Sequence, residues 1–160
     1  VSLSEVFHFK EAIFKNAEKE KFLQENLEID PLTDEQPTET KIKGLIESWL
    51  NGKAVVLSGG KSKFLSTVAR AQLVKRVKEE RLKDQALRES QIIEASITSL
   101  KIVSQTPKRI EVKAKIAYRD QRSSSSGEII SETSIPSLKV TYILGREKNL
   151  WQVVDYISGS

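Results

Sequence analysis

The hydrophobic positions of residues 41–60 recur every three or four residues, which is the spacing of an amphipathic helix. The apolar stripe consists of Ile42, Leu45, Ile46, Trp49 and Leu50. A stripe of this width is typical of a helix that packs one face on a core, and a buried tryptophan can anchor that core. We therefore expect a helix over about residues 38–57 around which the rest of the chain is organised.

The residues at both ends support this helix. Thr38 or Thr40 can cap the first turn, because a threonine hydroxyl accepts a hydrogen bond from an unpaired N–H. The glycines in residues 58–60 can end the helix in the left-handed conformation. The Gly-Lys-Ser sequence at 60–62 is similar to the end of a phosphate-binding loop. Such a loop requires a glycine at position 55, where this chain has valine, and a preceding strand, so we reject that interpretation.

A second helical pattern covers residues 64–88, with a break near residues 69–71. Its outer face mixes basic and acidic residues, which favours a solvated surface over a nucleic-acid interface, because no aromatic residues interleave for base stacking. Residues 1–37 are charged and end in a proline-containing linker at 30–37. Their weak helical stripe consists of Val6, Phe9, Ile13 and Ala17. We therefore divide the chain into a helical and linker N-terminal extension, 1–37, and a domain, 38–158.

After the second helix the apolar period changes to two, which predicts strands. The apolar positions change parity near Thr98, which predicts a bulge. Residues 110–118 alternate cleanly, as in a strand with one buried and one wet face. Pro136 interrupts the strand at 129–144 and marks an edge or a bulge. In the last strand, 150–157, the pattern places Trp151, Val153 and Ile157 on one side and Val154 and Tyr156 on the other.

Helices come first in this order, and four strands joined by short turns follow. That order predicts an α+β fold, in which the helices pack on a bent four-stranded antiparallel meander. A bent sheet that wraps a long helix would be similar to the cone of nuclear transport factor 2. The chain has 160 residues and a hydrophobic fraction of 38%, which is enough for one core.

Composition narrows the possible chemistry. A net charge of +4 permits an acidic partner but does not require nucleic acid. The absence of cysteine excludes a disulfide, a thiol nucleophile and a thiolate metal site. No apolar run is long enough to span a bilayer, so we expect any membrane segment outside this chain. The chain lacks methionine, which suggests a piece of a longer or processed protein. His8 has no carboxylate or serine beside it to make it catalytic, and we expect no cofactor or metal.

Short motifs recur along the domain. The helix carries Leu45-Ile46, Trp49-Leu50 and Lys53-Ala54, and the strands carry alternating segments at residues 100–103, 109–117, 140–144 and 150–153. In these motifs, residues 38–157 resemble the C-terminal domain of cyanobacterial and plastid division proteins of the ARC and ZipN type. One departure is Val56-Leu57-Ser58, where the family usually has Ala-Leu-Gly.

The resemblance implies a non-enzymatic scaffold domain of a membrane-anchored parent protein. In plastids such a domain lies in the intermembrane space and captures the tail of a partner division protein, and in cyanobacteria it would face the periplasm. We therefore expect a protein partner, such as the tail of another membrane or division protein, and no nucleic acid. A cytoplasmic location stays open as an alternative.

Two sets of residues are candidates for a binding site. The first is an aromatic group at the mouth of the sheet: Tyr118, Tyr142, Trp151 and Tyr156. The second is a basic face of the sheet formed by Arg109, Lys113, Lys115 and Arg119, which Lys101 and Lys139 could join. For the aromatic group the competing explanation is core packing, and for the basic face it is an ordinary solvated surface. Anionic lipid headgroups or an acidic tail would suit the basic face.

An alternative function is that of a small-molecule-binding domain or a small isomerase or dehydratase, because cone folds also host such enzymes. These enzymes need an acid or a histidine inside a pocket. Asp155 is the acid flanked by apolar residues in the last strand. One carboxylate without a partner is weak support, so we favour a domain that is not an enzyme.

Overall fold

The computed structural model describes residues 12–22, 36–62, 64–147 and 149–159. Residues 12–22 are helical. The elements that follow are α2 (Glu39–Leu57), α3 (Leu65–Val68), α4 (Ala71–Ala86), β1 (Glu89–Gln105), β2 (Arg109–Ser124), β3 (Ile129–Glu147) and β4 (Leu150–Ser158). The four strands form one antiparallel sheet in the order β1-β2-β3-β4.

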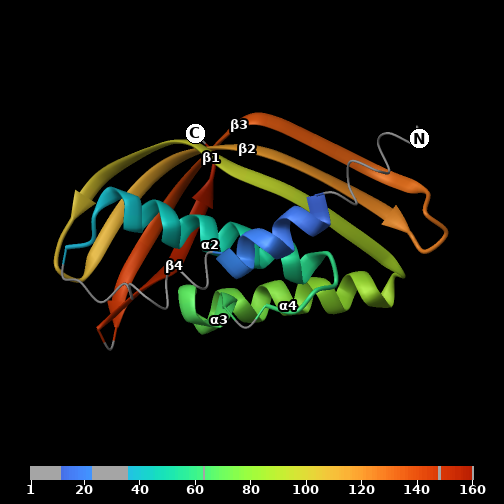
Figure 1. The fold of residues 1–160 in the computed structure, drawn as a ribbon, viewed down its shortest axis with the longest axis horizontal. Helices are drawn as coiled ribbons and strands as arrows, with labels where there is room; N and C mark the ends of the chain where they lie inside the picture. The colour runs from blue at the N-terminus through green and yellow to red at the C-terminus, as the bar shows by residue number, and fades with distance from the viewer. Residues whose placement is uncertain (1–11, 23–35, 63, 148, 160) are drawn as a thin grey trace.

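The sheet arches over the helices, and α2 lies between the sheet and α4 (Figure 1). The outer face of the arch carries none of the helices that the structure describes (Figure 1). The predicted α+β class and the antiparallel meander are therefore confirmed. The closer comparison with a nuclear transport factor 2 cone stays a prediction.

The predicted stripe of α2 forms the centre of the core. Ile42, Leu45, Ile46 and Trp49 are each at most 2% exposed. They belong to one apolar cluster with inward-facing sheet residues that include Val112, Tyr142, Leu144, Trp151 and Val153. Burial of such side chains contributes about 1.5–3 kcal/mol each, so this contact holds helix and sheet together.

Both ends of α2 follow the sequence expectation. Thr38 is the N-cap, and its hydroxyl accepts a hydrogen bond from the Lys41 N–H at 3.2 Å. At the other end Gly59 has φ +98°, and its N–H donates to the Val56 carbonyl. The left-handed conformation costs little for glycine, so the helix ends here and the chain turns toward α3.

The bulges of the sheet confirm two predictions and correct a third. The register between β1 and β2 shifts between Ile97 and Ser99, as the change in parity predicted. The register between β2 and β3 also shifts beside Pro136. A third shift, between Ile143 and Leu144 of β3, inserts an extra residue into β4. The sides predicted for the end of β4 are therefore wrong: Tyr156 packs on the core, and Ile157 is 65% exposed.

The weak stripe of the N-terminal extension is helical where the structure describes it, but it faces away from the domain. Ile13 is 37% exposed and Ala17 is exposed, whereas Ala12 is 2% exposed. Val6 and Phe9, the other two members, lie outside the described residues. The helical segment 12–22 therefore turns a small and polar face toward the domain, and hydrogen bonds and an ion pair hold it there.

Both edge strands carry contacts from helical segments. On β1 the Ile93 carbonyl accepts a hydrogen bond from the side-chain amide of Asn16 at 2.8 Å. On β4 the Val153 carbonyl accepts from the Arg70 N–H at 2.9 Å, and Ala69 forms a parallel bridge with Val153. The break between α3 and α4 falls at this contact, close to its predicted place. Covered edges are less able to pair with other strands.

Candidate functional site

Three aromatic rings meet where α2, β3 and β4 come together. The ring centroids of Trp49 and Tyr156 are 5.7 Å apart with planes tilted by 47°, and those of Tyr142 and Tyr156 are 6.3 Å apart at 41°. Tilted pairs at this distance are favourable beyond the area that they bury. Trp49 and Tyr142 are at most 2% exposed, whereas Tyr156 is half-buried. Tyr156 is therefore the ring of this cluster that solvent reaches.

Lys53 lies one turn after Trp49 on α2 and points over these rings. Its Nζ is 5.9 Å from the centroid of the Trp49 ring and 5.5 Å from that of Tyr156. A cation at this distance is attracted by the negative faces of the rings. The contact places a positive charge beside the partly open side of the aromatic cluster.

Lys53 also lines a pocket of about 280 Å³ between the helices and the start of the sheet. Glu80, Gln91, Tyr118 and Arg122 line the same pocket. Lys53 thus lies between two of the predicted aromatic residues, Tyr118 in the pocket and Tyr156 in the ring cluster. We group Lys53 with the half-buried tyrosine on each side of it and call this surface the Lys53 mouth: Lys53, Tyr118 and Tyr156.

Tyr118 is held as a neutral hydrogen-bond donor. Its hydroxyl donates to Oδ2 of Asp120 at 2.6 Å. Burial, followed by this bond to the carboxylate, raises the pKa of Tyr118 far above its usual value. Burial likewise raises the pKa of Tyr142. Neither tyrosine can act as a tyrosinate base near neutral pH, because burial disfavours the charged form.

An ion pair forms the far wall of the mouth. Nη1 of Arg122 on β2 lies 2.6 Å from Oδ1 of Asp84 on α4 and 3.5 Å from Oε1 of Glu89. Asp84 is 2% exposed. The hydrogen bond to Asp84 is the main cause of the raised pKa of Arg122. Such a pair fixes the orientation of α4 relative to the sheet, since removing one partner would leave a buried charge unpaired.

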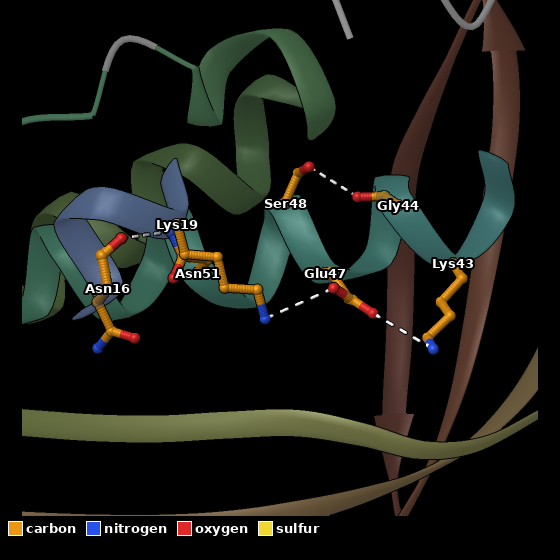
Figure 2. Close-up of polar contacts among 7 residues, drawn as sticks. All are labelled: Asn16, Lys19, Lys43, Gly44, Glu47, Ser48 and Asn51. Atoms are coloured by element: carbon orange, nitrogen blue, oxygen red, sulfur yellow. Dashed lines mark hydrogen bonds and ion pairs between the residues drawn. The ribbon is translucent and has the colours of Figure 1, made fainter. Parts of the chain in front are cut away.

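The helical segment 12–22 lies against α2 (Figure 2). Asn16 is its main contact: besides its bond to β1, its backbone carbonyl accepts a hydrogen bond from the Asn51 side chain at 2.9 Å. Glu47 of α2 lies between two lysines, with Lys19 at 3.5 Å and Lys43 at 3.8 Å (Figure 2). These contacts attach the segment to α2 and β1.

The segment also closes one side of a second pocket. Ala12 and Asn16 line a pocket of about 350 Å³ together with Tyr118 and Ile135. At the end of the segment, Glu20 is partly buried. This burial raises its pKa, and a hydrogen bond to Ser62 opposes the rise. Tyr118 therefore borders both pockets, one under the segment and one beside Lys53.

The four aromatic residues predicted as a site fall into two groups. Tyr142 and Trp151 are each 1% exposed and belong to the core, so a partner could not touch them in this conformation. Tyr118 and Tyr156 are half-buried and lie at the mouth. Lys53 was not predicted as a site residue. Its spacing of four residues from Trp49 was a usable signal, because such residues are neighbours on one helix face.

The predicted basic face is also rearranged. Glu111 separates Arg109 from Lys113 along β2, and the bulge beside Pro136 separates Arg119 from Lys115. The register instead pairs Lys113 with Lys101 and Lys115 with Lys139. The cluster that the structure brings together is therefore Lys101, Lys113, Lys115 and Lys139.

The structure offers little support for the enzyme alternative. Asp155 is exposed, and its Oδ1 accepts a hydrogen bond from the Tyr156 N–H at 2.8 Å. It is not the pocket acid that an isomerase needs. Within the ranges that the structure describes, no three acidic or histidine side chains come together as a metal site. His8 lies outside those ranges.

The fold and the mouth define a class of protein: a small α+β domain whose antiparallel sheet arches over one central helix. Residues 42–154 match the family model of the ARC6-like intermembrane-space domain. The match covers more than half of the chain, so the chain belongs to this family. This is the family that the sequence resembles, that of plastid and cyanobacterial division proteins.

A solved structure has the same fold. The crystal structure of the intermembrane-space region of the chloroplast protein ARC6 matches with a TM-score of 0.61 and 13% identity, over 77% of this chain and 97% of that one. A structure from Catenulispora acidiphila matches with a TM-score of 0.46 and 14% identity, over 76% of this chain and 92% of that one. A search of curated protein sequences finds no match.

The family agrees with the predicted placement as an extra-membrane domain, periplasmic or in the intermembrane space, of a membrane-anchored parent. Among the described residues, the helices are too short or too polar to span a bilayer.

Proposed function

We propose that this chain is a non-enzymatic protein-interaction domain, a scaffold in a membrane-associated division assembly. Residues 38–158 would form the domain, and residues 1–37 would form an extension of which 12–22 packs beside the mouth. The family supports this proposal, because it is the ARC6-like family of division-related proteins, and a matching solved structure is the intermembrane-space region of the chloroplast protein ARC6.

The Lys53 mouth is the surface that we propose for the partner. The observation that carries this proposal is the position of Lys53, whose charge lies over two rings and beside Tyr118. Half-buried tyrosines supply apolar area together with a polar group, as residues at protein interfaces often do. A lysine between them selects for an acidic group. The partner is therefore an extended segment, such as the tail of another membrane or division protein, that carries acidic and apolar residues.

A crosslinking experiment tests the surface directly. A photoreactive phenylalanine analogue replaces Tyr156 in one variant and Leu82 in the control, because Leu82 is 64% exposed on α4, away from the mouth. Each variant is expressed in the full-length parent and irradiated. We expect a specific crosslinked protein from position 156 and not from position 82.

Lys53→Met should then weaken this crosslink about tenfold, which corresponds to about 1.4 kcal/mol of binding free energy. Lys75→Met on the exposed side of α4 serves as the charge-matched control and should leave it unchanged. Equal crosslinking at both positions, or no effect of Lys53→Met in a folded variant, would contradict the proposed surface.

A further inference from the structure

Four lysines gather on the outer face of the sheet, opposite to the Lys53 mouth. The register places Lys101 of β1 directly across from Lys113 of β2, and Lys115 of β2 directly across from Lys139 of β3. Lys113 and Lys115 are two residues apart, so they point to the same face. Directly opposed side chains have Cβ atoms only about 5 Å apart. We call this group the lysine quartet: Lys101, Lys113, Lys115 and Lys139.

The quartet surrounds one depression of about 490 Å³. The four lysines are the charged residues among those that line it. The lining includes no residue of α2, although α2 covers the inner face, so the depression opens on the outside of the arch. All four lysines are exposed, and none forms an ion pair with another residue of the described ranges.

Two acidic residues lie next to the quartet on one side. Glu111 on β2 and Asp155 on β4 both lie opposite Ile143, one step along the sheet from Lys113. Like charges placed directly opposite each other destabilise a sheet. The chain therefore carries two unfavourable lysine pairs without a neutralising acid between them, and a ligand outside the domain is a physical reason for this arrangement.

Apolar residues beside the quartet indicate what that ligand is. Ile157 lies opposite Thr141, which lies opposite Lys113, and Ile157 is 65% exposed. Val103, two residues after Lys101, is 44% exposed. Exposed apolar side chains among lysines suit a surface that is anionic outside and apolar beneath, which describes a phospholipid leaflet. Lysines attract headgroup phosphates as point charges and do not require the bidentate geometry that arginine provides.

We propose that the lysine quartet binds the anionic phospholipid headgroups of a membrane surface. No described helix covers this face of the arch (Figure 1), so a flat surface can approach it. The Lys53 mouth then faces away from the membrane and stays open to a protein partner. This inference uses residues distinct from the Lys53 mouth, so each can fail without the other.

Vesicle sedimentation tests the proposal with the 160-residue chain. The vesicles contain 30% phosphatidylglycerol in phosphatidylcholine, and pure phosphatidylcholine vesicles are the neutral comparison. We expect the chain to sediment with the anionic vesicles at 50 mM salt and to be released at 500 mM, because the attraction is screened. We expect no sedimentation with neutral vesicles.

Charge-neutral variants locate the surface. Each lysine near an anionic membrane contributes about a fivefold gain in partitioning, so replacing all four quartet lysines by glutamine should lower binding by at least about a hundredfold. The matched control removes the same charge elsewhere, with Lys61, Lys75, Lys78 and Lys83 replaced by glutamine, and should retain binding within about threefold. The quartet variant should melt no lower than the wild type, because it loses like-charge repulsion.

Two results would overturn the proposal. One is a wild-type chain that does not sediment with anionic vesicles at low salt. The other is an equal loss of binding in both glutamine variants, which would assign the attraction to net charge alone. Free glycerol phosphate at millimolar concentration should not displace the chain; if it does, the depression binds a soluble phosphate compound and the membrane assignment is wrong.

Discussion

The two halves of β2 are held in place in different ways. In the first half, Ile110, Val112, Ala114 and Ile116 are each at most 3% exposed and pack in the apolar core. In the second half, directional contacts are more prominent. Arg122 bonds to Asp84 of α4, whereas the bond from Tyr118 to Asp120 lies within β2 and that from Gln121 to Glu132, at 2.8 Å, joins β2 to β3.

The difference shows how stability and recognition are divided within one sheet. Apolar burial contributes most of the folding free energy and has no preferred direction. Hydrogen bonds and ion pairs contribute less net free energy but fix the positions of the groups that make them. The half that is held by polar contacts is also the half that borders the Lys53 mouth. A binding surface there gains defined side-chain positions at the cost of lower local stability.

The largest effect is expected in the apolar core, which the first half of β2 shares with β4. Trp151→Ala removes a large side chain that is 1% exposed, which should lower the free energy of unfolding by about 3–5 kcal/mol. Urea unfolding measured by circular dichroism gives the value. Ile157→Ala on the same strand is the control and should change it by less than about 0.5 kcal/mol, because Ile157 is exposed. Similar losses of unfolding free energy in both variants would show that Trp151 is not part of the core.

An intermediate effect is expected for the ion pair of the polar half. Arg122→Met leaves the buried Asp84 carboxylate without its cation and should cost about 2 kcal/mol, since Arg122 itself is partly exposed. Adding Asp84→Leu should recover part of this loss, because no buried charge then remains. Urea unfolding of the two single variants and the double variant measures the coupling energy between Arg122 and Asp84. If the two losses simply add, the pair does not contribute as the structure indicates.

The smallest effect is expected for the contact that attaches segment 12–22. Asn16→Ala removes the donor to the Ile93 carbonyl and should cost about 1 kcal/mol. The loss is local, so hydrogen exchange should rise within residues 12–22 while the core of the sheet stays protected. Glu18→Ala, on the exposed side of the segment, is the control. Unchanged exchange in the Asn16 variant would mean that other contacts hold the segment.

Local signals made much of the fold predictable. The period of α2, the cap at Thr38 and the stop at Gly59 are short-range features, and all three were found. The parity change near Thr98 also revealed a bulge, because it interrupts the alternation of apolar residues within one strand. A bulge that depends on the partner strand leaves no such trace. The shift opposite Ile143 was therefore missed, and the sides of Tyr156 and Ile157 were exchanged.

The candidate site was predictable only in part. Alternation showed that Tyr118 and Tyr142 share a face of the sheet, but not that α2 covers Tyr142 and leaves Tyr118 half open. Arg122 and Asp84 are separated by 38 residues and carry no common local pattern. The same holds for the cross-strand pairs of the lysine quartet, which depend on the register of three strands. Lys53 could have been predicted as a site residue, because it lies four residues after Trp49 on the same helix.

The order of elements along the chain has a consequence for biosynthesis. Helix α2 is complete at Leu57, whereas β4, the strand that carries Trp151 and Val153, is the last of the elements that the structure describes to leave the ribosome. The apolar stripe of α2 must therefore stay without its final partners while about a hundred further residues are made. During that interval it is a ready contact for chaperones or for other nascent chains. The four strands, joined by short turns, can then close over it in a single late step.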